Sequence, residues 1–351
     1  MSLALRSADI LDTFVVPEEL EATAPPEFRG LERDQVPLLV AEPGAIRHRR
    51  FCDLGDELRP GDLLVVNNSA TIPAAIDIDG ETVVHFSTEL PGGLRVIEVR
   101  HRFGNTTRPA LQMVPGNLPL PDGGTIELLA PFPVDSPTRR LWVSHLDGDS
   151  SLRSLLSQWG RPISYAPNHE RFPIGVYQTV FAADPGSAEM PSAGRPFSTE
   201  LVASLVSRGI GIVPLTLHAG VSSLETGEPP YPEWFHVPEA TSDRVNRARA
   251  GGGRVIAVGT TVVRALETVS DSLGVTHPGR GWTDLHINQG TPVRSVDGVV
   301  TGWHEPRSTH LDMLLAIADR TLVAASYEAA IHLGYLWHEF GDSHLIWSER
   351  A

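Results

Sequence analysis

Lysine is absent from this 351-residue sequence, so its 28 fixed positive side chains are all arginines. Schiff-base chemistry on a lysine amine is therefore excluded. Cys52 is the only cysteine, which excludes an internal disulfide and a thiolate metal cluster. No apolar run approaches the roughly 20 residues of a membrane-spanning helix, and the N-terminal residues show no secretory signal. We expect a cytoplasmic protein with no membrane partner.

Positive charge is also scarce, because 43 acidic residues outnumber the arginines and the net charge is −15. Proteins that mainly grip nucleic acid usually carry a basic face, so this balance argues against such a role. The length suits two domains with a sizeable core. We further expect a monomer.

The sequence changes character twice along its length. Residues 62–67 form an apolar run that predicts a buried strand. From about residue 70 to 150, short β-like segments alternate with Gly, Pro, Asn and Asp clusters, which is typical of an antiparallel sheet or small barrel. We therefore place an inserted antiparallel β domain at residues 69–150, between two parts of a core domain at residues 1–68 and 151–351.

Helix-like and strand-like segments alternate from residue 151 onward. One helix is expected after Ser198, with Leu201, Leu205 and Val206 on its buried face, and a last one over residues 325–340. Strands are expected at residues 254–258 and 284–288. The alternation predicts an α/β fold with a mostly parallel sheet, open or closed into a barrel.

Polar or small residues follow four of the predicted strands. Because ligands of α/β folds lie beyond the carboxyl ends of the strands, we expect these segments to meet at one polar pocket. They are residues 69–71, residues 219–223, residues 259–261 and His304.

The segment "GGGRVIAVGTT" is glycine-rich but does not match a dinucleotide-binding fingerprint, because Gly251, Gly252 and Gly253 precede the strand. After the strand, Gly259 permits close approach, and Thr260 or Thr261 is expected to cap the next helix. Such a helix start offers free N–H groups to an anion. The alternative is an ordinary strand-to-helix junction.

Histidines near the C-terminus invite a metal interpretation that their spacing does not support. His304 and His310 lie six residues apart with Pro306 between them, so they lack the H-E-x-x-H geometry, and we expect no metal site. His338 and Glu339 in "WHEF" invite the same zinc interpretation, and they too lack the H-E-x-x-H spacing. Ser308 or Thr309 is better explained as the cap of the next helix.

A loop at residues 190–197 reads "MPSAGRPF". Its small residues would let a ligand lie against the backbone, although a surface loop would look the same. The sequence contains neither a G-x-S-x-G elbow nor a P-loop, so hydrolase and nucleotide-kinase functions lack their usual signatures.

Taken together, several segments resemble the S-adenosylmethionine:tRNA ribosyltransferase-isomerase family of queuosine biosynthesis. The resemblance covers most of the chain and runs in the family's order, through "RPGDLLVVNNSATIPA", "VYQTVFAADPGSAEMPSAGRPF", "VPLTLHAG", "GGRVIAVGTTVVRALET", "VDGVVTGWHEPRSTHLDML" and "YLWHEFGDSHLI". It implies an open α/β barrel-like core with an inserted antiparallel β-barrel domain.

The resemblance also implies a reaction in which S-adenosylmethionine supplies a ribosyl unit rather than a methyl group. A base removes a proton beside the sulfonium, adenine leaves, and the aminomethyl group of a 7-deazaguanine in tRNA attacks the sugar; loss of methionine then gives epoxyqueuosine. S-Adenosylmethionine is thus a substrate, and no metal is required. We assign His304 as the preferred base and His218 as the second candidate. The expected S-adenosylmethionine-binding residues are Gly259, Thr260, Thr261, Arg264, Ser192, Ala193, Gly194, Ser308, Thr309 and Asp342.

Departures from the family pattern leave the acceptor open. Ala70 stands where the family usually has arginine, and Arg195 and Pro196 replace a Leu-His pair. The usual Phe-Phe-Ser-Tyr-Gly-Asp is "WHEFGD" here. These changes and the net charge of −15 weigh against tRNA, so the alternative is a paralogue that uses S-adenosylmethionine on a small-molecule acceptor. A non-catalytic binding protein on the same scaffold is a third hypothesis.

Overall fold

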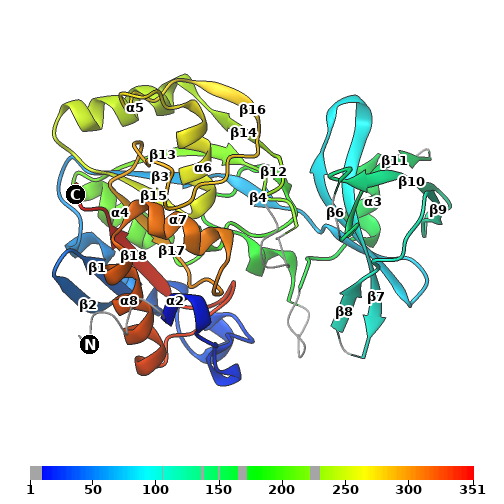
Figure 1. The fold of residues 1–351 in the computed structure, drawn as a ribbon, viewed down its shortest axis with the longest axis horizontal. Helices are drawn as coiled ribbons and strands as arrows, with labels where there is room; N and C mark the ends of the chain where they lie inside the picture. The colour runs from blue at the N-terminus through cyan, green and yellow to red at the C-terminus, as the bar shows by residue number, and fades with distance from the viewer. Residues whose placement is uncertain (1–9, 105, 136–137, 149–150, 165–171, 222–229) are drawn as a thin grey trace.

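The computed structural model describes residues 10–104, 106–135, 138–148, 151–164, 172–221 and 230–351 (Figure 1). A mixed nine-stranded sheet forms the larger part of the structure. Its order is β16 (Gly279–Thr283), β14 (Glu233–Val237), β13 (Gly211–Leu217), β3 (Leu63–Asn67), β15 (Val255–Val258), β17 (Gly298–Thr301), β18 (Ser343–Trp347), β1 (Pro37–Glu42) and β2 (Ala45–Arg50).

The sheet is less parallel than expected, because only some of its neighbouring strands run in the same direction. The central strands β13, β3, β15 and β17 are parallel neighbours, and β1 is parallel to β18. Both ends of the sheet and the β17–β18 pair are antiparallel. The short connection between β1 and β2 contains no crossover helix, so these two strands cannot pair in parallel.

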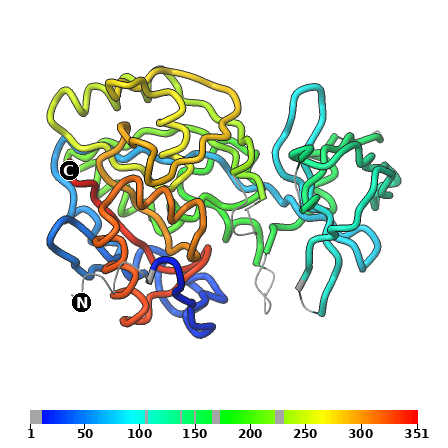
Figure 2. The backbone as a smooth tube through the Cα atoms, viewed as in Figure 1, coloured from blue at the N-terminus to red at the C-terminus, as the bar shows by residue number. Residues whose placement is uncertain are grey.

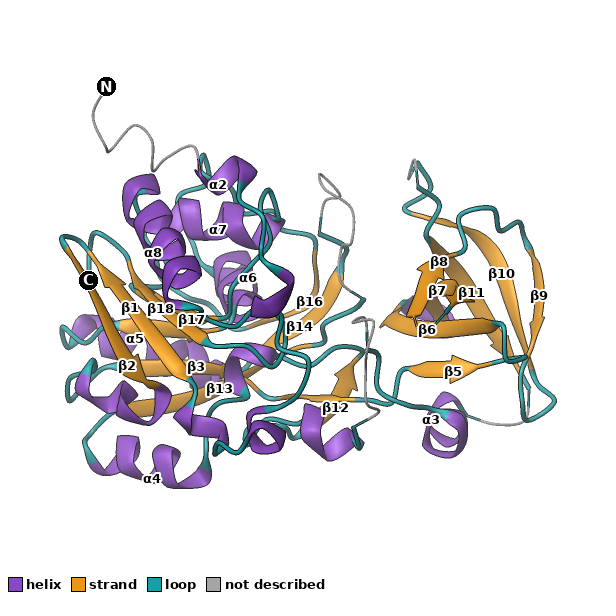
Figure 3. Ribbon diagram, turned by 90° about the horizontal axis from the view of Figure 1, so that it is seen from below, coloured by secondary structure: helices purple, strands orange, loops and turns teal. Residues whose placement is uncertain are grey.

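The buried apolar run at β3 supplies both faces of the sheet. Leu63 and Val65 pack into one hydrophobic core, and Leu64 and Val66 pack into a second core on the opposite face. Figure 3 shows helices on both sides of this sheet. Residues of α5 (Glu239–Ala250), α6 (Thr260–Val269), α7 (Thr309–Ile317) and α8 (Arg320–Leu333) join the first core, as does Leu11 of α2 (Ile10–Thr13), and residues of α4 (Thr199–Ser207) join the second.

A second sheet lies beside the main body and is built from the glycine- and proline-punctuated segments (Figure 1). It is antiparallel and contains β5 (Ala75–Asp77), β6 (Thr82–Glu89), β7 (Leu94–Phe103), β11 (Leu141–Asp147), β10 (Thr125–Phe132) and β9 (Gly116–Pro119), with β8 (Thr106–Pro109) paired to β7. Helix α3 (Leu152–Trp159) packs Leu155 and Leu156 against it.

The chain passes from the main body to this sheet and back through two neighbouring segments (Figure 2). Outgoing β4 (Ser69–Thr71) pairs in parallel with returning β12 (Asp184–Ser187). The Ser69 hydroxyl lies 2.7 Å from the Ser187 hydroxyl, which ties the two segments together inside the protein.

Helix α4 confirms part of its expected packing. Ser198 caps it by accepting a hydrogen bond from the Leu201 amide at 3.0 Å, and Leu201 and Leu205 are buried. Val206 is 57% exposed, so its expected burial was wrong. It follows Leu205 by about 100° around the helix and thus leaves the face that holds the i, i+4 pair.

Two other segments differ from their expected extents. The expected strand at residues 284–288 is not formed; strand β16 instead ends at Thr283, and the Leu285 carbonyl accepts a hydrogen bond from the Arg264 side chain at 3.2 Å. The last helix ends at Leu333, because Gly334 adopts a left-handed conformation with φ of 74°. Among the described residues, no helix is long and apolar enough to cross a membrane.

Candidate functional site

A cavity of about 690 Å³ lies at the carboxyl ends of the parallel strands. Thr71 lines it after β3 and β4, Ala219 after β13, Gly259 after β15 and His304 after β17. The structure therefore brings together the four strand ends singled out from the sequence, although residues 222 and 223 lie outside the described residues. The segment that follows β12 adds further lining residues, namely Ala188, Glu189, Met190, Pro191, Ser192 and Ala193.

The turn after β15 begins α6 differently from the expected way. Gly259 is the N-cap residue, with φ of 98° and ψ of 153°, and no side chain caps the helix, so the expected cap by Thr260 or Thr261 was wrong. The helix already includes both threonines, which leaves their amides without acceptors in their own helix. The Thr261 hydroxyl instead lies 3.3 Å from the Asn67 amide nitrogen.

Gly259 also lies close to the small-residue loop on the other side of the cavity. A Cβ added at Gly259 would lie 3.4 Å from the Ala193 Cβ. Ser192 and Ala193 line the cavity, whereas Gly194 is buried behind them against Thr179. Gly259 and the loop of small residues therefore lie close together in the lining, and neither has a large side chain that would occupy the cavity.

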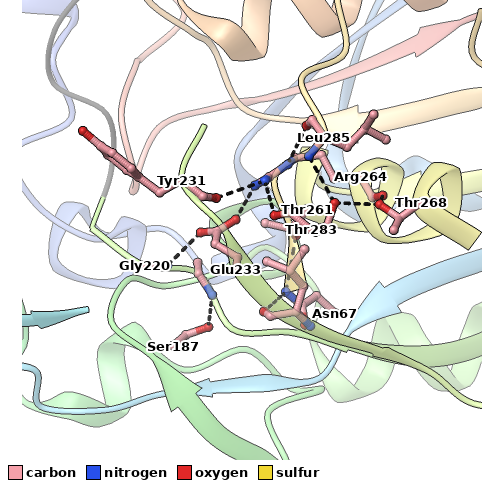
Figure 4. A network of polar contacts seen from close by, with 12 residues as sticks. Asn67, Ser187, Gly220, Tyr231, Glu233, Thr261, Arg264, Thr268, Thr283 and Leu285 are labelled. Carbon is pink, nitrogen blue, oxygen red and sulfur yellow. Dashed lines mark hydrogen bonds and ion pairs between the residues drawn. The ribbon is translucent and has the colours of Figure 1, made fainter. Parts of the chain in front are cut away.

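Arg264 points its guanidinium into a network of the protein's own groups (Figure 4). It pairs with the Glu233 carboxylate and donates to the carbonyls of Thr283 at 3.0 Å, Leu285 at 3.2 Å and Tyr231 at 3.3 Å. The Glu233 carboxylate also accepts a hydrogen bond from the Gly220 amide at 2.7 Å. Arg264 therefore lines the cavity while joining α6 to β14 and to the segment after β13.

The two histidines after β17 are stacked in the cavity wall. The rings of His304 and His310 lie 4.8 Å apart, and His304 Nε2 lies 2.8 Å from the Thr301 hydroxyl. Burial, with a further contribution from His310, lowers the pKa of His304 well below 6.5; burial also lowers the pKa of His310 to about 4. Both imidazoles are therefore neutral near pH 7, and the same burial makes His304 a weaker base than a free imidazole.

The helix after these histidines begins as expected at one of the two candidate caps. Ser308 caps α7 by accepting a hydrogen bond from the Leu311 amide at 3.2 Å, and Thr309 is the first helical residue. Both residues line the cavity. They place a second helix N-terminus in its wall, across from the start of α6.

His218 and Asp342 lie outside the lining of this cavity. His218 Nδ1 lies 2.7 Å from the Ser69 hydroxyl, the ring stacks on Trp234, and burial lowers the pKa of the imidazole. Asp342 accepts a hydrogen bond from the Leu336 amide at 2.7 Å. His218 therefore holds the β4 segment, and Asp342 holds the segment that begins at Leu336.

Two glutamates of the cavity are absent from the binding and catalytic residues expected from the sequence. Glu189 and Glu339 both line it, and each is only partly exposed. Burial, followed by the charge of Glu189, raises the pKa of Glu339 to about 8, although Arg195 acts in the opposite direction. The available signal was "WHEFGD", where Glu339 takes the place of a serine in the family pattern.

The residues that depart from the family pattern at the nearby loop do not reach the cavity. Arg195 is buried; its guanidinium pairs with Glu27 at 2.8 Å and donates to the Val176 carbonyl at 3.1 Å. Pro196 follows it in the wall of a separate small hollow. Within the described part of the chain, no group of three or more His, Cys, Asp and Glu side chains is placed to hold a metal ion.

The fold and this cavity define a mixed α/β protein with a cavity of small-molecule size at the carboxyl ends of its parallel strands. The comparisons with known proteins agree. The family model described as "Queuosine biosynthesis protein" matches residues 12–346, and the chain belongs to this family.

Similar proteins extend the match over the whole chain. An S-adenosylmethionine:tRNA ribosyltransferase-isomerase of Symbiobacterium thermophilum is 35% identical over 343 residues, which cover 94% of this chain and 97% of that protein. One from Gloeobacter violaceus is 34% identical, with 95% and 94% covered. The crystal structure of the S-adenosylmethionine tRNA ribosyltransferase of Thermotoga maritima matches with a TM-score of 0.53 and 26% identity, covering 96% of this chain and 99% of that one.

Proposed function

We propose that the protein is an S-adenosylmethionine:tRNA ribosyltransferase-isomerase. It transfers and isomerises the ribosyl moiety of S-adenosylmethionine onto 7-aminomethyl-7-deazaguanine in tRNA, and it releases adenine and methionine. The observation that carries this proposal is the match to proteins of that name over nearly the full length of both chains. The transferase and isomerase steps both take place on the sugar, so one cavity serves them.

The cavity supports the binding of S-adenosylmethionine. Its volume of about 690 Å³ falls within the usual range for small-molecule sites. The unpaired amides at the start of α6 and α7 suit the methionine carboxylate, because helix N-termini favour anions. Ser192 and Ala193 offer a wall of small residues, and Gly194 supports it from behind.

We assign three supporting roles from the contacts. Arg264 fixes the start of α6 through Glu233 rather than holding the ligand's carboxylate with a free guanidinium. Asp342 holds the loop that carries Glu339, through the Leu336 amide. His218 joins the β4–β12 crossing through Ser69.

His304 is the proposed base for the proton beside the sulfonium. It lines the cavity, it is neutral near pH 7, and its contact with Thr301 fixes the ring. General base catalysis by a positioned imidazole typically contributes about 10²–10⁴-fold. The remaining chemistry uses leaving groups that the substrate itself carries, and the proposal requires no metal.

The proposal also covers the domain organisation, the oligomeric state and the location of the protein. The main sheet forms an open α/β barrel-like core domain at residues 1–68 and 151–351, and the second sheet forms an inserted antiparallel β-barrel domain at residues 69–150. Helix α3, just after this boundary, packs on the second sheet. The two sheets and the paired β4–β12 crossing support this division. The protein acts as a monomer in the cytoplasm.

Adenine release tests the function. Purified protein is incubated with S-adenosylmethionine alone, with tRNA bearing 7-aminomethyl-7-deazaguanine, and with the free 7-aminomethyl base. Adenine and methionine released only with the tRNA support the proposal. Release with the free base and not with tRNA would instead indicate the small-molecule paralogue, and failure to bind S-adenosylmethionine would reject both.

A further inference from the structure

Glu339 is held at the cavity by a turn whose position is fixed from several sides. The Gly341 amide donates to the His338 carbonyl at 3.0 Å, which closes the turn around Glu339. Arg29 donates to the Phe340 carbonyl at 2.9 Å, and the Phe340 ring is buried. These contacts place the Glu339 carboxyl in the wall of the cavity rather than in open solvent.

The turn contains a backbone conformation that non-glycine residues rarely adopt. His338 has φ of 70°, in the left-handed region, and it directly precedes Glu339. Arg307, with φ of 57°, is another such residue in the lining of the same cavity. Strained positions of this kind persist where the surrounding structure enforces them, and they cluster at functional sites.

The Glu339 carboxyl has no hydrogen-bond or ion-pair partner within the part of the chain that the structure describes. Arg195, whose charge lowers the pKa of Glu339, is already paired with Glu27. Glu189 and Glu339 face the same cavity, and Tyr177 also interacts with the charge of Glu339. His338, the preceding residue, faces Glu21 at 3.6 Å.

Among the described residues that line the cavity, glutamates outnumber arginines. Its two arginines are Arg264, which is neutralised by Glu233, and Arg307. Its five glutamates are Glu21, Glu189, Glu233, Glu305 and Glu339. A cationic group that enters the cavity therefore meets a wall rich in carboxyl groups, of which Glu339 is one.

We propose that Glu339, beside Glu189, takes a proton from the ammonium group of the acceptor amine and so releases the amine nitrogen for attack on the sugar. The proposal rests on the function proposed above, in which the acceptor is an aminomethyl group. It gives the cavity two separate proton acceptors, with His304 serving the carbon beside the sulfonium and Glu339 serving the acceptor.

The step balances without a further reactant. One N–H bond of the ammonium breaks, and its proton forms an O–H bond on the Glu339 carboxylate. The electron pair left on nitrogen forms the new C–N bond to the sugar, while the pair of the sugar–adenine bond leaves with adenine. Attack leaves a secondary ammonium and an adenine anion; one proton passes from that ammonium to the departing adenine, so both products are neutral.

The charge environment favours this transfer. The pKa of an ordinary glutamate is about six pKa units below that of an alkyl ammonium such as lysine. An ordinary glutamate therefore accepts a proton from an ammonium group poorly. Burial and Glu189 raise the pKa of Glu339 to about 8, which is within about two pKa units of that amine. At pH 7 only the ionised minority of Glu339 acts as the base, and this fraction grows as the pH rises toward 8. A proton acceptor near the operating pH transfers most efficiently.

The pH dependence of adenine release tests the role, with the aminomethyl tRNA as acceptor from pH 6.5 to 10. For Glu339→Gln we expect kcat at pH 7 to fall about 10²–10³-fold and to recover about tenfold per pH unit until the amine itself is deprotonated. S-Adenosylmethionine affinity, measured by calorimetry, should change less than about threefold, because the variant keeps the shape of the site. Glu339→Asp should restore part of the rate at pH 7.

A second variant probes the pair. Glu189→Gln should shift the alkaline rise of wild-type activity to lower pH, because it removes a charge that raises the pKa of Glu339. Glu349→Gln removes an equal charge at an exposed position near the C-terminus and should leave the profile unchanged. A structural role for Glu339 would lower the rate equally at every pH.

The outcomes separate the two proposals. If the wild type releases adenine and Glu339→Gln is fully active at pH 7, the role of Glu339 is overturned and the proposed function stands. The same holds if the activity of Glu339→Gln is reduced at pH 7 and does not recover at high pH. Wild-type protein that releases no adenine with the aminomethyl tRNA rejects the proposed function, and the role of Glu339 with it.

Discussion

Arg264 on α6 is paired with Glu233 on β14, and both side chains are largely buried in the cavity wall. Removing one partner of a buried ion pair leaves an uncompensated charge and costs about 3–5 kcal/mol. We expect Arg264→Ala to lower the free energy of unfolding by about that amount, measured by urea denaturation. Arg264→Ala combined with Glu233→Ala should be less destabilised than the single variant; an equal or larger loss would show that the pair is not the cause.

Gly259 should tolerate no side chain without cost. Its φ of 98° lies in a region that other residues rarely adopt, and a Cβ would meet Ala193 at 3.4 Å. We expect Gly259→Ala to destabilise the protein by about 1–3 kcal/mol and to weaken S-adenosylmethionine binding. Gly175→Ala is the matched control, because a Cβ there meets nothing within 4 Å. Wild-type affinity in Gly259→Ala would remove this turn from the proposed binding site.

His304 provides a third prediction. We expect His304→Ala to reduce kcat by about 10²–10⁴-fold with a similar loss from pH 6.5 to 9, because the imidazole stays neutral over this range. His310→Gln, which alters the stacked neighbour, should cost much less. Unchanged turnover in His304→Ala would remove the base assignment, and the uniform loss distinguishes this residue from Glu339.

His344 should make the protein sensitive to acid. It is buried and stacked on Trp303 with ring centroids 4.6 Å apart, and neither ring nitrogen has a hydrogen-bond partner among the described residues. Burial lowers its pKa to about 3. The folded protein therefore binds fewer protons than the unfolded chain, and stability falls as pH drops below 6.5, by up to about 1.4 kcal/mol per pH unit.

The variant His344→Phe should remove this loss while retaining the stack. We expect it to melt at a higher temperature than the wild type, with the difference growing from pH 7 to pH 5. The exposed His332→Gln should leave the pH dependence unchanged. A difference between His344→Phe and wild type that stays constant with pH would contradict the explanation.

Glu339 should affect the stability of the protein in the opposite sense to His344 as the pH changes. Its folded pKa of about 8 lies above the unfolded value near 4.5, so the folded protein binds the extra proton and stability declines as pH rises from about 4.5 to 8. Because the residue is partly exposed, we expect Glu339→Gln to raise the free energy of unfolding by only about 1–2 kcal/mol at pH 8.5 and by almost nothing at pH 4.5. Equal stability of the two proteins at pH 8.5 would contradict the raised pKa.

Much of the fold followed from local sequence pattern. The apolar run of β3 and the short segments of the second sheet were located correctly, because strand periodicity and turn residues are local signals. The strand expected at residues 284–288 was not, since β16 takes its partner from β14, more than 40 residues earlier, and Leu285 bonds to Arg264 instead. The local sequence of one segment does not show which distant segment it pairs with.

The sequence by itself determined which strand ends meet at the candidate cavity. The carboxyl ends of parallel strands share one edge, so the order of strands and helices was enough to gather Gly259, His304 and their neighbours. Only the tertiary structure decided what the charged residues do. Arg264 is held by Glu233, Arg195 by Glu27, and Glu339 faces the cavity with a raised pKa, because charge pairing and burial depend on contacts between residues far apart in the chain.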